Sequence, residues 1–114
     1  MSNSLSRTER DILKKKYSKY FTLVKKIINE LDPVGLIGMG APEDEHDTLT
    51  GQVLLLIVND RMDEVRELII KSHERYGYGV DTIRDEFKGK FYKEIDETTK
   101  KINDLYKNYK EEKI

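Results

Sequence analysis

The sequence predicts an all-α protein, a compact bundle of four helices plus a short helical turn, with a long C-terminal helix. Apolar residues recur at intervals of three and four through most of the chain, which is the spacing of one buried helix face. Charged residues make up 38% of the chain and apolar residues 37%, a balance typical of helices with one apolar stripe and wide solvated faces. The 114 residues suit one domain, so we expect residues 1–114 to form a single helical domain.

The first predicted helix spans residues 7–31 and follows the capping-box spacing of Ser6-Arg7-Thr8-Glu9. Its apolar stripe consists of Ile12, Leu13, Tyr17, Tyr20, Phe21, Val24, Ile27, Ile28 and Leu31. Asp32 and Pro33 should end this helix, because the residue before a proline is displaced from the helical region. Asp32 is then placed to cap a short turn that has Pro33 in its first position.

The second predicted helix covers residues 48–58, with Asp47 as its N-cap. Apolar residues occupy so much of its surface that we expect it to be the central, most buried helix. These residues are Leu49, Val53, Leu54, Leu56 and Ile57. A strand competes over residues 53–58, since short apolar runs are ambiguous, but no second strand is predicted with which it could pair.

The last two predicted helices follow Asp60 and Asp81, each expected to be an N-cap, and Gly77 is expected to end the first of them. The apolar stripe of the last helix consists of Ile83, Phe87, Phe91, Ile95, Thr98, Ile102, Leu105 and Tyr109. Its later steps alternate between four and three, a heptad pattern. The half after Thr98 has little apolar mass, so we expect it to project from the domain, to fray, or to pair with a second copy as a homodimer.

The composition also bears on the compartment. The chain contains no cysteine, which excludes disulfides, thiolate metal sites and cysteine nucleophiles and fits a reducing environment. Its first ten residues lack the apolar core of a signal peptide. The longest apolar run, 53–58, is far shorter than the roughly 20 residues that span a bilayer. We therefore expect a cytoplasmic protein without a membrane partner.

The net charge of −1 conceals two oppositely charged segments. Residues 1–29 carry 8 Lys/Arg against 2 Asp/Glu, a net +6, whereas residues 30–67 carry 2 Lys/Arg against 10 Asp/Glu, a net −8. This asymmetry suits either a bipolar surface that steers a partner or two segments that neutralise each other when packed. A sequence pI near 6.1 argues against nucleic acid as the partner, because domains that bind it are basic overall.

The acidic segment 40–47 is the densest group of polar side chains in the sequence. We expect it to bind a basic protein partner, because exposed carboxylates speed the association of a cationic surface. The predicted binding residues are Glu43, Asp44, Glu45 and Asp47. No catalytic, cofactor-binding or metal-binding motif is present, so we expect no cofactor and no enzymatic activity. The alternative function is a small metal-dependent enzyme or ligand sensor that uses residues 43–47 with His46. In a third interpretation the carboxylates are structural: they face solvent at the start of a helix, where the helix dipole favours negative charge.

Two segments, 27–36 and 40–47, resemble a known family. The first reads Ile-Ile-Asn-Glu-Leu-Asp-Pro-Val-Gly-Leu and the second Gly-Ala-Pro-Glu-Asp-Glu-His-Asp. In this order they resemble the YugE-like domain of unknown function of small bacterial helical proteins, over about residues 20–70. The chain departs from that pattern at Leu31, where a tryptophan is common, and at His46, where an aromatic residue is common. The resemblance implies a helical fold and a bacterial source and assigns no catalytic residues. Similar motifs occur in proteins described as immunity partners of secreted toxins, so we expect an immunity-type or regulatory binding protein.

Overall fold

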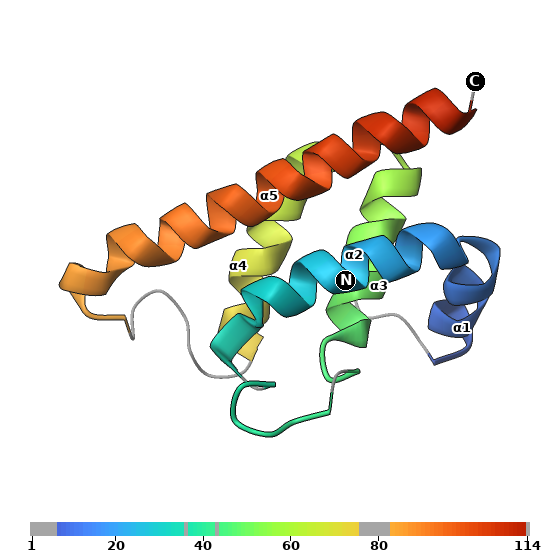
Figure 1. Cartoon of the computed structure of the whole chain (residues 1–114). Helices are drawn as coiled ribbons and strands as arrows, with labels where there is room; N and C mark the ends of the chain where they lie inside the picture. Colours follow the sequence, from blue (N-terminus) through green and yellow to red (C-terminus); the bar gives the residue numbers. More distant parts are fainter. Residues whose placement is uncertain (1–6, 36, 43, 76–82, 114) are drawn as a thin grey trace.

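The computed structural model describes residues 7–35, 37–42, 44–75 and 83–113, and all regular structure within these ranges is helical (Figure 1). The elements in chain order are α1 (Arg7–Lys16), α2 (Ser18–Leu31), the 3-10 turn η1 (Pro33–Gly35), α3 (Asp47–Val58), the 3-10 turn η2 (Met62–Glu64), α4 (Val65–Arg75) and α5 (Asp85–Lys113). The predicted all-α fold is confirmed, including helix over residues 53–58, where a strand competed. None of the described helices is long and apolar enough to cross a membrane.

The long helix α5 extends along one side of the molecule and packs against both α2 and α4 (Figure 1). Helix α2 also contacts α3, and α1 folds against α2 and α3. The molecule measures 45 × 29 × 26 Å along its principal axes. The apolar side chains without any exposed surface are Val24, Ile28, Val53, Leu54, Ile57, Val65, Ile69, Ile95 and Ile102. Because they come from α2, α3, α4 and α5, these four helices share one core.

Helix α3 is the central helix, as its apolar composition predicts. Val53, Leu54 and Ile57 are completely buried. The polar residue Thr50 is also completely buried, and Gln52 is only 3% exposed. A helix buried on nearly all sides cannot show a narrow apolar stripe. This is why its sequence reads as a continuous apolar run.

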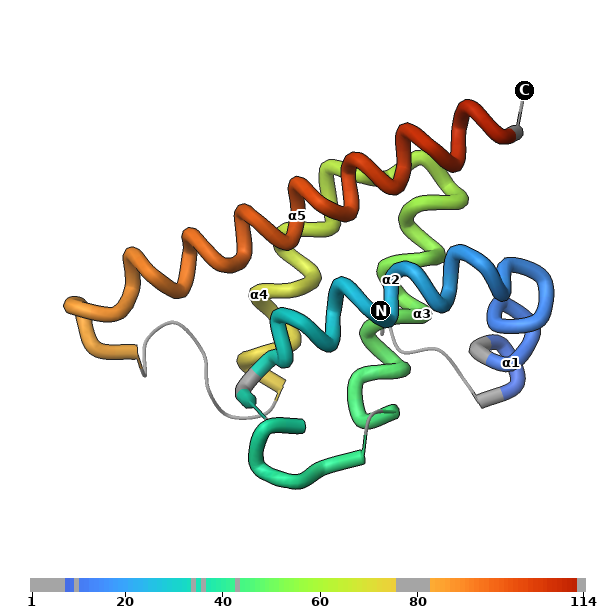
Figure 2. The backbone as a smooth tube through the Cα atoms, in the orientation of Figure 1, coloured from blue at the N-terminus to red at the C-terminus, as the bar shows by residue number. Residues whose placement is uncertain are grey.

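The predicted helix 7–31 is divided into α1 and α2 by a bend at Tyr17 (Figure 2). Tyr17 has a φ of −123° and a ψ of 41°, outside the helical range. Its ring packs edge-on against Tyr109 of α5, with ring centroids 6.4 Å apart. The bend allows α1 to fold against α3, so that Leu13 packs against the same core as α2. Ile12, predicted to belong to the apolar stripe, is instead 57% exposed.

The predicted capping role of Asp60 is wrong. Asp60 has a left-handed φ of 58°, and η2 separates it from α4. Its carboxylate accepts a hydrogen bond from the Tyr106 hydroxyl at 2.8 Å and pairs with the Lys110 ammonium at 3.1 Å. Asp60 therefore joins the end of α3 to α5. Three other predicted boundary residues, Ser6, Gly77 and Asp81, lie outside the described residues.

The second half of α5 is packed, so the prediction that it projects or frays is wrong. Its core residues are Ile102, Leu105 and Tyr109, at 0%, 7% and 7% exposure. Near the end of the helix, Glu112 accepts hydrogen bonds from the Tyr20 hydroxyl and from the Lys19 ammonium, the latter at 2.6 Å. The heptad stripe is thus used within the chain, while Phe87 near the start of α5 is 54% exposed. Pairing with a second copy stays a prediction.

Candidate functional site

Asp32 organises residues 32–46, which connect α2 to α3 and are called the 32–46 loop below. Asp32 is the C-cap of α2 and has a φ of 47°, in the left-handed region that aspartate visits more readily than most residues. Its Oδ1 accepts a hydrogen bond from the Ile37 amide at 3.0 Å, and its Oδ2 accepts one from the Gly38 amide at 2.9 Å. One side chain thereby fixes the path of the loop just after the helix ends.

His46 provides the third contact to this carboxylate. Its Nε2 lies 2.8 Å from Asp32 Oδ1, and the residue is only 1% exposed. Burial raises the pKa of the Asp32 carboxyl, but hydrogen bonds from the Gly38 amide, the His46 ring and the Ile37 amide outweigh burial and hold this pKa below its usual value. Asp32 is therefore ionised at neutral pH, and the pair joins the two ends of the 32–46 loop.

The four predicted binding residues are Glu43, Asp44, Glu45 and Asp47, and those that the structure describes differ in exposure. Asp44 and Glu45 are exposed, and neither forms an ion pair with any residue that the structure describes. Asp47 is only 6% exposed. Glu43 lies outside the described residues. The exposed acidic group that the structure defines is therefore Asp44 with Glu45.

Asp47 begins α3 without capping it, because His46 occupies the N-cap position and no side chain bonds the helix amides there. The predicted N-cap role of Asp47 is therefore wrong. Its carboxylate pairs with the Lys25 ammonium at 3.2 Å and with the Lys14 ammonium at 3.6 Å. These lysines come from α2 and α1, so at Asp47 the basic first segment and the acidic middle segment neutralise each other. Carboxylates in the first turn are also favoured by the helix dipole.

His73, the second histidine, is buried and bonded to the backbone of its own helix, α4. Its Nδ1 donates to the Ile69 carbonyl at 3.0 Å, and its ring packs edge-on against Phe91 with centroids 4.9 Å apart. Burial lowers the pKa of His73 below its usual value, so the ring is neutral at pH 7. Within the described ranges, no group of three or more His, Cys, Asp or Glu residues is placed to hold a metal ion.

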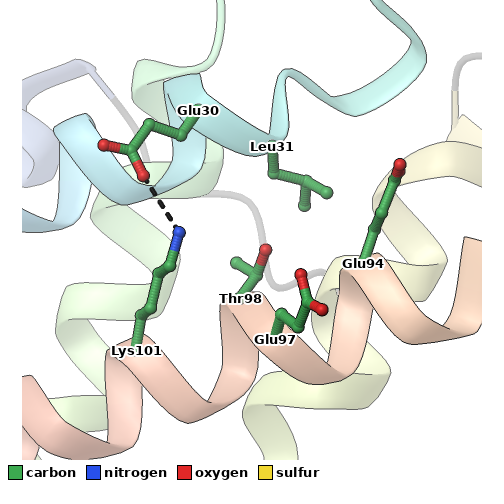
Figure 3. Close-up of a pocket in the computed structure, with 6 residues that line it drawn as sticks. All are labelled: Glu30, Leu31, Glu94, Glu97, Thr98 and Lys101. Carbon is green, nitrogen blue, oxygen red and sulfur yellow. Dashed lines mark hydrogen bonds and ion pairs between the residues drawn. The ribbon is translucent and has the colours of Figure 1, made fainter.

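A pocket that the sequence did not predict lies between the last turn of α2 and the middle of α5 (Figure 3). It has a volume of about 190 Å³ and is lined by Glu30, Leu31, Glu94, Glu97, Thr98 and Lys101. An ion pair of 3.1 Å between Glu30 and Lys101 closes one side. The spacing of residues 94, 97, 98 and 101 places them on one helix face, a signal that could have indicated the α5 wall. Nothing in the sequence places Glu30 opposite that wall.

No family model matches this chain, and no curated protein or solved structure matches it at a significant level. The resemblance to the YugE-like family therefore stays a prediction. We infer the function from the side chains of this chain.

Proposed function

We propose that this protein is a non-enzymatic binding module that recognises a basic protein partner through Asp44 and Glu45. The observation that supports this proposal is an exposed carboxylate pair on a loop held by the 2.8 Å contact between Asp32 and His46. A pre-organised loop loses less conformational entropy on binding than a flexible one. Surface carboxylates without internal ion pairs raise the association rate of a cationic partner.

The same loop also presents an apolar side chain. Met39 is 69% exposed, and its unbranched thioether adapts to irregular surfaces. An apolar contact combined with charged groups at the edge is the usual composition of a protein interface. This combination supports a protein partner over a simple cation.

The proposal includes an immunity-type or regulatory role in a bacterium, which the resemblance to YugE-like proteins supports, and a cytoplasmic location, which the lack of cysteine supports. The alternative, a metal-dependent enzyme or sensor at residues 43–47, lacks a donor set among the described residues. His46 is bonded to Asp32, and Asp47 is paired with two lysines.

The test is capture of a partner from the native lysate, followed by association kinetics with the purified partner. The loop variant is Asp44→Lys with Glu45→Lys. The matched control is Asp104→Lys with Glu111→Lys. It reverses the charge at two exposed carboxylates of α5 that likewise pair with no described residue. We expect the association rate to fall about tenfold or more in the loop variant at low salt, and to change little in the control. Equal rates for the two variants would overturn the proposal.

A further inference from the structure

We propose that the α2/α5 pocket binds a primary alkylammonium group, the chemistry shared by a lysine side chain and a free diamine. Three carboxylates and one ammonium line the pocket. The pocket adjoins the last turn of α2, where backbone carbonyls carry a partial negative charge and where no basic residue stands. The local field therefore favours a cation. This site shares no residue with Asp44 and Glu45 and does not depend on the function proposed for them.

Thr98 gives a second, independent indication of a ligand. It is only 6% exposed, yet its hydroxyl makes no hydrogen bond with any described residue. Threonine within a helix commonly bonds the carbonyl four residues earlier, as the neighbouring Thr99 does to Ile95 at 2.8 Å. The Thr98 oxygen instead points from α5 toward α2, into the pocket (Figure 3). The Thr98 residue is thus buried except where its hydroxyl oxygen opens onto the pocket, so this oxygen is free to accept a hydrogen bond from a ligand.

The remaining walls match an alkylammonium group. An ammonium has three N–H donors and no acceptor, and Glu94, Glu97 and Thr98 offer acceptors along one side of the pocket (Figure 3). Leu31 supplies an apolar surface for the methylene stem, which long cationic side chains bury in this way. A volume of about 190 Å³ suits an ammonium with a few methylenes, since pockets for larger ligands begin near ~300 Å³.

Lys101 is an internal competitor for this site. Its ammonium lies 3.1 Å from Glu30, and the two side chains are 56% and 50% exposed, so their pair adds little stability. Its positive charge opposes an incoming cation at the edge of the pocket. Replacing Lys101 with methionine keeps the stem and removes the charge, so this variant should bind an alkylammonium more tightly than the wild type.

The first experiment titrates the amide NMR spectrum with n-butylammonium. We expect saturable shifts at α2 and α5, with Kd raised about fivefold or more by Glu97→Gln and by Thr98→Val, because each removes one hydrogen-bond acceptor. We expect Kd to fall about threefold in Lys101→Met and to stay unchanged in the control Glu111→Gln, which alters an exposed carboxylate outside the pocket. Urea denaturation of each variant confirms the fold. An absence of saturable shifts, or one common Kd in all variants, would overturn the proposal.

The second experiment identifies the source of the ammonium. The probes are a blocked peptide with one lysine, the same peptide with that lysine acetylated, and 1,4-diaminobutane. Tighter binding of the lysine peptide assigns the site to a protein chain, and tighter binding of the diamine assigns it to a free amine. An acetylated peptide that binds as well as the unmodified one would overturn the proposal. The Asp44→Lys, Glu45→Lys variant should bind butylammonium normally, which separates this site from the loop.

Discussion

Replacing Asp32 with alanine is the sharpest perturbation of the 32–46 loop. It removes the acceptor of three hydrogen bonds, donated by the Ile37 and Gly38 amides and by the His46 ring. It also leaves alanine at a φ of 47°, without the short polar side chain that makes this conformation tolerable for aspartate. The loss therefore combines hydrogen bonding with backbone strain.

The His46 nitrogen contributes the largest share of the expected loss. Because His46 is 1% exposed, water cannot replace the missing acceptor, and an unsatisfied buried group costs about 1–3 kcal/mol. The two amides are partly buried or exposed, so water compensates there and each costs about 0.5 kcal/mol. The left-handed backbone adds about 1 kcal/mol. We expect Asp32→Ala to lower the free energy of unfolding by about 3–5 kcal/mol, a large share of the roughly 5–15 kcal/mol of a typical domain.

The assay is urea denaturation followed by helical circular dichroism at neutral pH, with hydrogen exchange at the Ile37 and Gly38 amides. Asp32→Gly should be about 1 kcal/mol milder than Asp32→Ala, because glycine adopts the left-handed conformation freely. Asp32→Asn, which keeps one acceptor, should be milder still. A loss below about 1 kcal/mol for Asp32→Ala, with unchanged exchange at both amides, would refute the assigned role.

The pH dependence gives an independent check on Asp32. Its pKa is lower in the folded chain than in the unfolded one, so the unfolded state binds more protons at acidic pH. The stabilisation is complete above the unfolded pKa of about 4 and is lost as pH falls through the folded value. The difference in stability between wild type and Asp32→Ala should therefore shrink in that acidic range.

Three further predictions concern the core and its charges. In urea denaturation, Ile102→Ala should cost about 2–5 kcal/mol, because this residue is completely buried, whereas Phe87→Ala at a 54% exposed site should cost less than about 1 kcal/mol. The free energy of unfolding should fall as pH drops below about 6.5. The folded state lowers the pKa of His73, so the unfolded chain binds more protons in this range. His73→Asn should flatten this pH dependence in denaturation curves recorded between neutral and mildly acidic pH. Asp47→Asn should lower the free energy of unfolding by about 1 kcal/mol at low salt, because it removes the negative charge from two ion pairs and from the first turn of α3. At about 1 M salt the loss should be smaller, because salt screens these charges.

Each of these predictions has a clear contrary outcome. If Ile102→Ala were as mild as Phe87→Ala, the second half of α5 would not belong to the core. An unchanged pH slope in His73→Asn would assign the effect to other groups. Equal losses from Asp47→Asn at low and high salt would show that its contribution is not electrostatic.

The features that could be predicted from the sequence depend on local rules. A proline restricts the residue before it wherever the chain goes next, so Asp32 and Pro33 predicted the end of α2 and the following short turn. The apolar run 53–58 predicted a buried helix because no partner strand was present. The stripe of the last helix was also predicted, and Ile95 and Ile102 are indeed in the core.

The features that could not be predicted depend on residues far apart in the chain. Steps of three and four fit a bent helix as well as a straight one, and Tyr109 packs against the bend at Tyr17. Asp47 reads as part of an exposed acidic run, but lysines from two earlier helices cover it. The pocket at Thr98 exists only because α2 and α5 meet.

The packing of α2 against α5 also has a kinetic consequence. The hydrogen bonds between these helices join residues 71 to 93 positions apart, whereas most helical bundles fold rapidly because their contacts are local. Closing so long an intervening segment costs chain entropy before any contact forms. During synthesis, Val24 and Ile28 of α2 therefore stay uncovered by α5 until that helix has left the ribosome. The nascent chain is most prone to aggregation in this interval.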